Sequence, residues 1–185
     1  SSQRQSHGRA LAALQENGRY AVGLLKRELS MAGFLGAYVL PIQPEPRPVT
    51  GDCGPRHWAL DVQYPLEFID GAQGGLLTTA ANVLNCIDAG DLQEQSDVIA
   101  LKRVAGEPSL RDGYYPTAST SATRTQWFLR SDRDGSVTSW HYVEDGGFPP
   151  HDALPQSGID YWRYFVSIFY IRNYMLRAGD GTPAL

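Results

Sequence analysis

The stretch LQENGRYAVGLLKRELSMAGF, residues 14–34, decides the fold of this chain, because its apolar positions recur with the period of an α-helix. The stripe extends upstream to Leu11, and no proline interrupts the chain before Pro41. Gly33 follows the last apolar position and suits the left-handed conformation that commonly ends a helix. We therefore predict one helix from near Gln3 to Gly33, about 45 Å long. The stripe consists of Leu11, Leu14, Gly18, Ala21, Leu25, Leu29 and Ala32.

This helix is predicted to have two roles, because it is longer than a small domain, which is ~30 Å across. Its C-terminal half is expected to pack on the rest of the chain, as a helix-to-sheet core made by Leu25, Leu29 and Ala32. Its N-terminal half is expected to overhang and to pack against other helices, as in fibre subunits. This assembly interface comprises Leu11, Leu14, Gly18 and Ala21, and Ala21 is also expected to contribute to the core.

The remaining sequence predicts β-strands. Alternating apolar and polar residues at 57–64, and an apolar-rich run at 96–104, are typical of strands. Segments 126–130 and 136–143 flank the dipeptide Asp134-Gly135, which favours a β-hairpin. The run 162–175 is apolar on both faces, which indicates a central strand. A turn is expected at 178–181, and residues 182–185 look like the start of a return strand whose body is missing.

Helix and strands are segregated along the sequence, so we predict the α+β class: one long N-terminal α-helix packed on an antiparallel β-sheet domain. The helix occupies residues 1–35 and a β-rich head occupies residues 36–185. Four prolines enforce an extended segment early in the head, at positions 41, 44, 46 and 48. Residues 70–95 leave two alternatives open, a short helical turn or a loop.

Composition and charge argue against several classes of protein. With 42% apolar and 19% charged residues, the 185-residue chain has the composition of a globular domain, not of a disordered segment. A net charge of −4 argues against nucleic-acid binding. The charge is uneven, because residues 1–35 carry five basic and two acidic side chains while the remainder carries 11 and 18. No apolar stretch is long enough to span a membrane. Because the helical pattern begins almost at once, we expect an upstream segment that has been removed or that lies outside the given sequence.

The two cysteines, Cys53 and Cys86, lack the spacing of a metal site. Two buried free thiols and one disulfide both remain open, and the disulfide is favoured if the protein is exported.

No motif predicts catalysis, a metal site or a cofactor. The histidines do not form HExxH, no GxSxG is present, and Gly71–Gly75 matches no phosphate-binding loop. Asp132-Arg133-Asp134-Gly135 has part of the pattern of a calcium loop, but a hairpin turn accounts for it. We therefore expect a protein that is not an enzyme.

Several segments resemble the family of type IV pilus assembly protein PilW. LQENGRYA (14–21) and LLKRELSMAGF (24–34) are similar to the segment that directly follows the hydrophobic N-terminus in that family. SDVIALKR (96–103), FYIRN (169–173) and GDGTPAL (179–185) are similar to an internal strand, a late strand and its following turn. The helix motif is the most specific of these, and residues 37–95 are not distinctive.

The resemblance implies a pilin-like fold and a minor pilin that primes pilus assembly at or near the fibre tip. Its implied partners are other minor pilins and the major pilin, bound through the helix, together with a tip adhesin. Such proteins are made as prepilins anchored in the inner membrane with the head in the periplasm, and they then join the pilus on the cell surface. Family chains usually continue past the turn at 179–183, so the C-terminal part is expected to be missing. Family cysteines often follow the AG-aromatic motif directly, whereas Cys53 comes later, so the pairing stays open.

Three other interpretations of the function are alternatives to a type IV pilus minor pilin. The nearest is a J-type minor pseudopilin of type II secretion, although the DG-x-P-x-L ending favours the pilus. The second is a secreted or periplasmic enzyme. The third is a carbohydrate-binding adhesive domain, suggested by three aromatic residues that core or cross-strand packing also explains: Tyr114, Tyr115 and Trp127.

Overall fold

A computed structural model describes most of the chain. The described residues are 2–36, 44–72, 77–78, 83–88, 90–111, 126–132, 138–143 and 158–174. Tyr114, Tyr115, the hairpin turn at 133–137 and the predicted turn at 178–181 lie outside them, as do residues 79–82 within the segment left open above.

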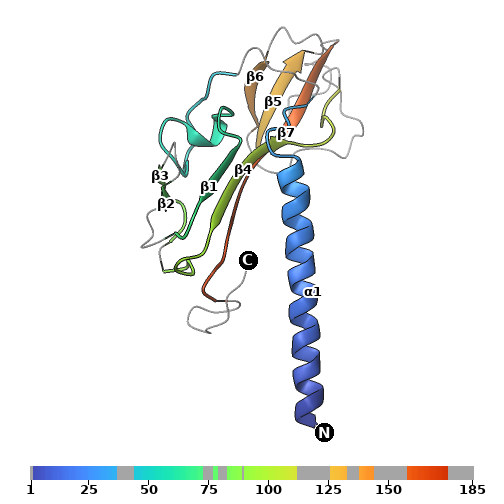
Figure 1. The fold of residues 1–185 in the computed structure, drawn as a ribbon. Coiled ribbons are helices and arrows are strands. Elements are labelled where there is room, and N and C mark those ends of the chain that lie inside the picture. The colour runs from blue at the N-terminus through green and yellow to red at the C-terminus, as the bar shows by residue number, and fades with distance from the viewer. Residues whose placement is uncertain are drawn as a thin grey trace.

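The predicted long helix is confirmed as α1, Ser2–Ser30, which projects from the rest of the molecule (Figure 1). It ends a few residues before position 35, and Gly33 adopts a φ of 74°, the left-handed conformation expected of a helix terminator. Among the described residues, no helix is long and apolar enough to cross a membrane.

The head contains a five-stranded antiparallel sheet, which confirms the α+β class. The strand order is β1-β4-β7-β5-β6, with a separate pair formed by β2 (Leu77–Thr78) and β3 (Val83–Leu84). The large sheet comprises β1 (Leu66–Ile69), β4 (Val98–Val104), β5 (Gln126–Asp132), β6 (Thr138–Val143) and β7 (Ile159–Tyr170). As predicted, β5 and β6 pair as a hairpin and β7 is the central strand, although β7 begins three residues earlier than expected.

The strand predicted at 57–64 is wrong. Residues Trp58–Leu60 form the short 3-10 helix η1, and the first strand of the sheet begins only at Leu66. The Asp52 carboxylate holds this turn, because it accepts hydrogen bonds from the backbone N–H groups of Gly54 and Ala59. The alternating burial is nevertheless real, since Trp58, Leu60 and Val62 are all buried. The alternation arises because residues 57–64 pack on one face of the sheet as an irregular segment, although they are not a strand of that sheet.

Most of the core lies on one face of the sheet, here called the front face, while a smaller buried cluster lies on the opposite face and comprises Leu110, Phe128, Ile159 and Tyr161. The even-numbered residues of β4 and β7 point to the front face, where Trp162, Tyr164 and Val104 pack with Leu35 and Leu60. Further along the same strands, Val98 and Ala100 pack with Trp58 and Leu84. The loop layer, defined as residues 44–62 with β2 and β3, therefore covers the front face.

Candidate assembly site: the projecting helix and its base

The middle of α1, residues 11–20, is exposed to solvent. Every residue from 11 to 20 is exposed, including Leu14, which is 72% exposed, and Leu11, which is 52% exposed. Gly18 has no neighbouring atom where a Cβ would stand, and Ala21 is half-buried. The four residues of the predicted assembly interface therefore lie on the projecting part of the helix. A largely exposed apolar stripe is a surface from which a helix–helix contact gains free energy by burial.

The residues predicted as helix-to-sheet core contribute less than expected. Leu25 and Ala32 are half-buried, whereas Leu29 is 38% exposed, and none of the three belongs to the described core clusters. The prediction is thus wrong for Leu29. The physical reason is that the helix turns the preceding residue, Glu28, toward Arg103 of the sheet, and successive helical residues point about 100° apart, so Leu29 is turned away from that contact.

A buried ion pair fastens the base of α1 to the sheet. Glu28 is 4% exposed, and its two carboxylate oxygens accept hydrogen bonds from Nε and Nη2 of Arg103 at 2.7 and 2.9 Å. The hydrogen bond from Arg103 holds the pKa of the Glu28 carboxyl below its ordinary value of 4.5. The Arg103 guanidinium also stacks over the Phe165 ring at 4.8 Å. A bidentate pair of this kind fixes orientation as well as distance.

Two backbone hydrogen bonds complete the attachment. The N–H of Gly33 donates to the carbonyl of Lys102, and the N–H of Val104 donates to the carbonyl of Phe34. The chain then passes to the front face, where Gly36, at a φ of 88°, lies against the Trp162 ring. Neither the ion pair nor these bonds could be predicted from sequence, because residues 28 and 103 are 75 positions apart.

The Glu28–Arg103 pair gives stability a pH dependence with a definite sign. The pKa of Glu28 is lowered in the folded state. The ion pair therefore contributes fully to the free energy of unfolding above pH ~4.5, and this contribution is lost as the pH falls through the pKa of the folded state. We expect Glu28→Gln to reduce the free energy of unfolding by about 1–3 kcal/mol at pH 7. Urea unfolding from pH 7 to pH 3 should show this difference shrinking toward zero.

The matched control is Glu16→Gln, on the exposed part of the same helix, which should leave stability unchanged throughout. A Glu28→Gln deficit that stays constant down to pH 3 would contradict an ionic origin.

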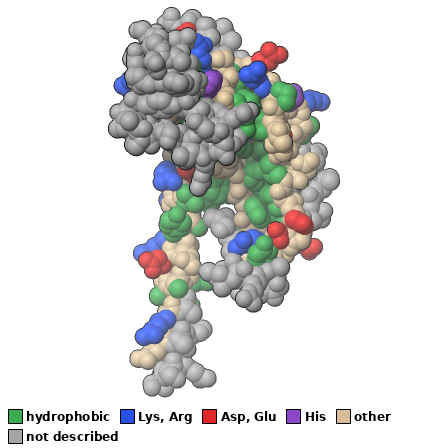
Figure 2. Space-filling view, turned by 180° about the vertical axis from the view of Figure 1, so that it is seen from behind, with side chains coloured by type: hydrophobic (Ala, Val, Ile, Leu, Met, Phe, Trp, Pro, Cys, Tyr) green, Lys and Arg blue, Asp and Glu red, His purple; other side chains and the backbone are tan. Residues whose placement is uncertain are grey.

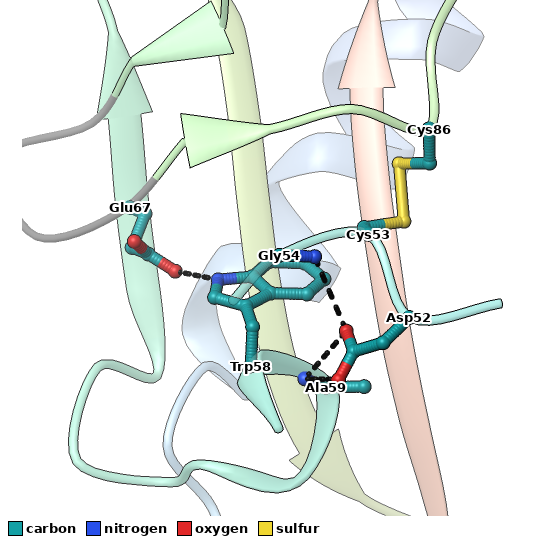
Figure 3. Close-up of a disulfide and its surroundings, with 7 residues drawn as sticks. All are labelled: Asp52, Cys53, Gly54, Trp58, Ala59, Glu67 and Cys86. Carbon is teal, nitrogen blue, oxygen red and sulfur yellow. Dashed lines mark hydrogen bonds between the residues drawn. A yellow bond between two sulfur atoms is a disulfide. The ribbon is translucent and has the colours of Figure 1, made fainter. Parts of the chain in front are cut away.

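A second buried polar cluster joins the loop layer to the sheet. Lys102 is 1% exposed, and its Nζ donates to the Asp61 carbonyl at 2.8 Å and lies 3.7 Å from the Glu67 carboxylate. The Lys102 ammonium lies 4.4 Å from the centre of the Trp58 ring, and the indole N–H of Trp58 donates to the same Glu67 carboxylate (Figure 3). Burial lowers the pKa of Lys102, against the opposing effect of the Glu67 charge. The cluster is internal, and its hydrogen bonds bind loop layer and sheet together.

Beside this cluster, Cys53 and Cys86 form a disulfide (Figure 3). Of the two alternatives left open by the sequence, the structure therefore has the bonded one. The backbone N–H of Asn85 also donates to the Cys53 carbonyl, so two parts of the loop layer, the segment around Cys53 and the residues directly after β3, are held together twice.

The described residues offer little chemistry beyond these contacts. No group of three or more His, Cys, Asp or Glu side chains among them could hold a metal ion. Trp127, one of the aromatics weighed as an adhesive surface, is half-buried, and its ring meets Trp140 edge to face and Tyr142 at a tilt. Trp127 thus packs across the β5–β6 hairpin, as the alternative to a carbohydrate-binding surface predicts.

Comparison with known proteins adds no relative, because no protein-family model, curated protein or solved structure matches this chain.

Proposed function

We propose that this chain is the helix and head of a type IV pilus minor pilin of the PilW kind, which primes pilus assembly in a tip complex. The observation that carries the proposal is α1, a 29-residue helix whose apolar side chains stand in solvent outside the core of the head. The partners would be other minor pilins and the major pilin through α1, with a tip adhesin above them. The full-length protein would be anchored in the inner membrane before assembly.

The energetics of α1 support a role in assembly. A helix with Gly8, Gly18 and Gly23 loses up to ~1 kcal/mol at each glycine relative to alanine, so it depends on packing for its stability. Among the described residues of α1, the half-buried and buried ones lie in its last three turns, from Ala21 onward. Burying an exposed leucine such as Leu11 or Leu14 against another helix would contribute about 1.5–3 kcal/mol. A helix bundle shared with neighbouring subunits supplies both the packing and the burial.

Leu14→Glu tests the proposal. We expect at least tenfold weaker binding to the soluble domains of partner minor pilins, because a charge replaces an apolar contact. The melting temperature should not change, because Leu14 is exposed and contributes nothing to the core of the head. Pull-down and calorimetric titration measure binding, and differential scanning calorimetry measures stability.

The matched control is Gln15→Glu, which adds the same charge next to Leu14 but off the stripe. Unchanged binding together with a large drop in melting temperature for Leu14→Glu would reject the assembly role of this helix.

The J-type pseudopilin is the second candidate, because a projecting helix serves that role equally well. Complementation separates the two. The chain joined to a pilin membrane segment should restore surface pili in a strain that lacks its PilW-like minor pilin. Restored type II secretion in a strain lacking its J-type pseudopilin, without restored pili, would favour the second candidate.

A further inference from the structure

Three tryptophan side chains are buried in the head, and two of them have a hydrogen-bond acceptor for the indole N–H. Trp58 donates to the Glu67 carboxylate, and Trp162 donates to the Ser131 hydroxyl. Trp140 is 4% exposed, and no acceptor for its indole N–H lies among the described residues. A buried polar group that lacks a partner costs about 1–3 kcal/mol, so it marks a place where another molecule can supply that partner.

Trp140 also lines a pocket of about 380 Å³. Its strand, β6, is an edge strand that pairs only with β5, and the proline-rich start of the loop layer forms the other side of the pocket. The volume falls within the ~300–1,000 Å³ that is typical of small-ligand sites. The lining residues are Glu45, Pro46, Arg47, Pro48, Ser139 and Trp140. A buried indole whose N–H lacks an acceptor therefore borders a pocket that can hold a small ligand.

The lining of this pocket is chemically mixed. The Glu45 carboxylate accepts hydrogen bonds, the Arg47 guanidinium donates them, and the Ser139 hydroxyl does both. Glu45 and Arg47 are exposed and have opposite charges, so together they select neither an anion nor a cation. The rings of Pro46 and Pro48 add apolar surface. A ligand for this pocket therefore needs both donors and acceptors on a compact body that also has apolar patches.

A sugar ring has these properties. Its hydroxyl groups both donate and accept hydrogen bonds, its C–H groups pack against apolar and aromatic side chains, and it carries no charge. By contrast, a carboxylate or phosphate ligand would face the like charge of Glu45, and a wholly apolar ligand would leave the Trp140 N–H without an acceptor.

The pocket and the assembly helix lie at different ends of the molecule. β6 is at the end of the head farthest from the N-terminus of α1 (Figure 1). Figure 2, seen from behind, shows α1 extending beyond the head at the other end. A ligand in the pocket would therefore not compete with helices that pack along residues 11–20 of α1.

We propose that this pocket binds an uncharged sugar of one or two rings, and that a sugar hydroxyl oxygen accepts the hydrogen bond from the indole N–H of Trp140. Glu45 and Arg47 bind further hydroxyl groups at the rim of the pocket. The site is independent of pilus assembly, and either property can exist without the other.

The indole N–H resonances of the four tryptophans, observed by NMR in ¹⁵N-labelled protein, test the proposal. The Trp140 resonance is identified as the one that is absent from the Trp140→Phe variant. The unmodified chain is titrated separately with galactose, glucose, mannose, N-acetylglucosamine and the disaccharide lactose. We expect at least one of these sugars to shift the Trp140 resonance to saturation. The resonances of Trp58 and Trp162, which already have acceptors, should stay in place.

The double variant Glu45→Ala/Arg47→Ala should bind that sugar at least tenfold more weakly, because it loses two groups that hold the hydroxyls. Its melting temperature should not change, because both side chains are exposed. The matched control is Glu107→Ala/Arg111→Ala, which removes the same two charges from exposed positions outside the pocket. This control should leave the dissociation constant unchanged.

Three outcomes would overturn the proposal. The first is that none of the five sugars shifts the Trp140 resonance. The second is an equal shift with glycerol, a polyol without a ring, or with glycine, a zwitterion, which would show that the pocket does not select a sugar. The third is equal weakening by the two double variants, which would place the bound sugar elsewhere. None of these results affects the Leu14→Glu pull-down with other pilins.

Discussion

Lys102→Met should lower the free energy of unfolding by about 3–5 kcal/mol, even though methionine fills a similar volume. The loss arises because the substitution removes the ammonium group beside the buried Glu67 carboxylate and leaves that charge in a medium of low dielectric constant. The Asp61 carbonyl also loses its hydrogen bond from Nζ. Urea unfolding followed by tryptophan fluorescence measures the change, and Trp58, against which Lys102 packs, should report it directly.

The double variant Lys102→Met/Glu67→Gln separates charge from packing. Glutamine keeps an oxygen that can accept the indole N–H of Trp58, and it carries no charge. We therefore expect the double variant to recover part of the lost stability. A double variant less stable than Lys102→Met alone would show that the buried charge is not the source of the loss.

Removing the disulfide by Cys53→Ala/Cys86→Ala should lower the free energy of unfolding by about 4 kcal/mol, on the chain-entropy account. The bond closes a loop between positions 33 apart, which contains η1, Trp58 and β1. Without it, the unfolded chain gains conformational freedom, whereas the folded state keeps its other contacts. Thermal unfolding with and without dithiothreitol measures the effect.

The reductant provides the internal control. It should lower the melting temperature of the unmodified chain to that of the double alanine variant, and it should leave the variant unchanged. Equal melting temperatures for the oxidised chain and the variant would contradict a stabilising bond.

The elements with strong local patterns could be predicted from the sequence. The helix was predictable because its stripe repeats over several turns and ends at a glycine, and the hairpin because Asp134-Gly135 lies between two strand-like runs. β7 was predictable because its residues are apolar on both faces, as those of a central strand must be. All three signals are local, so tertiary contacts did not override them.

The errors lie where tertiary contacts decide. In β1 the charged residue Glu67 is buried, whereas the apolar residues Leu66 and Phe68 are exposed. This is the opposite of the pattern expected for a strand packed on a core, so the sequence does not indicate β1. Conversely, the alternation around Trp58 looks like a strand but belongs to a turn that Asp52 fixes by its side chain. The Glu28–Arg103 pair at the candidate site depends on a contact between distant segments, which periodicity cannot predict.

The attachment of α1 to β4 also determines how the molecule bears mechanical load. Backbone hydrogen bonds run across a strand, so a pull along β4 loads the Gly33–Lys102 and Phe34–Val104 bonds together, in shear, not one after the other. From β4 the tension passes into the full length of its pairing with β7 and then into the hairpin. Traction on the helix along β4 would therefore load both bonds at the same time, and it would reach the rest of the sheet through β4.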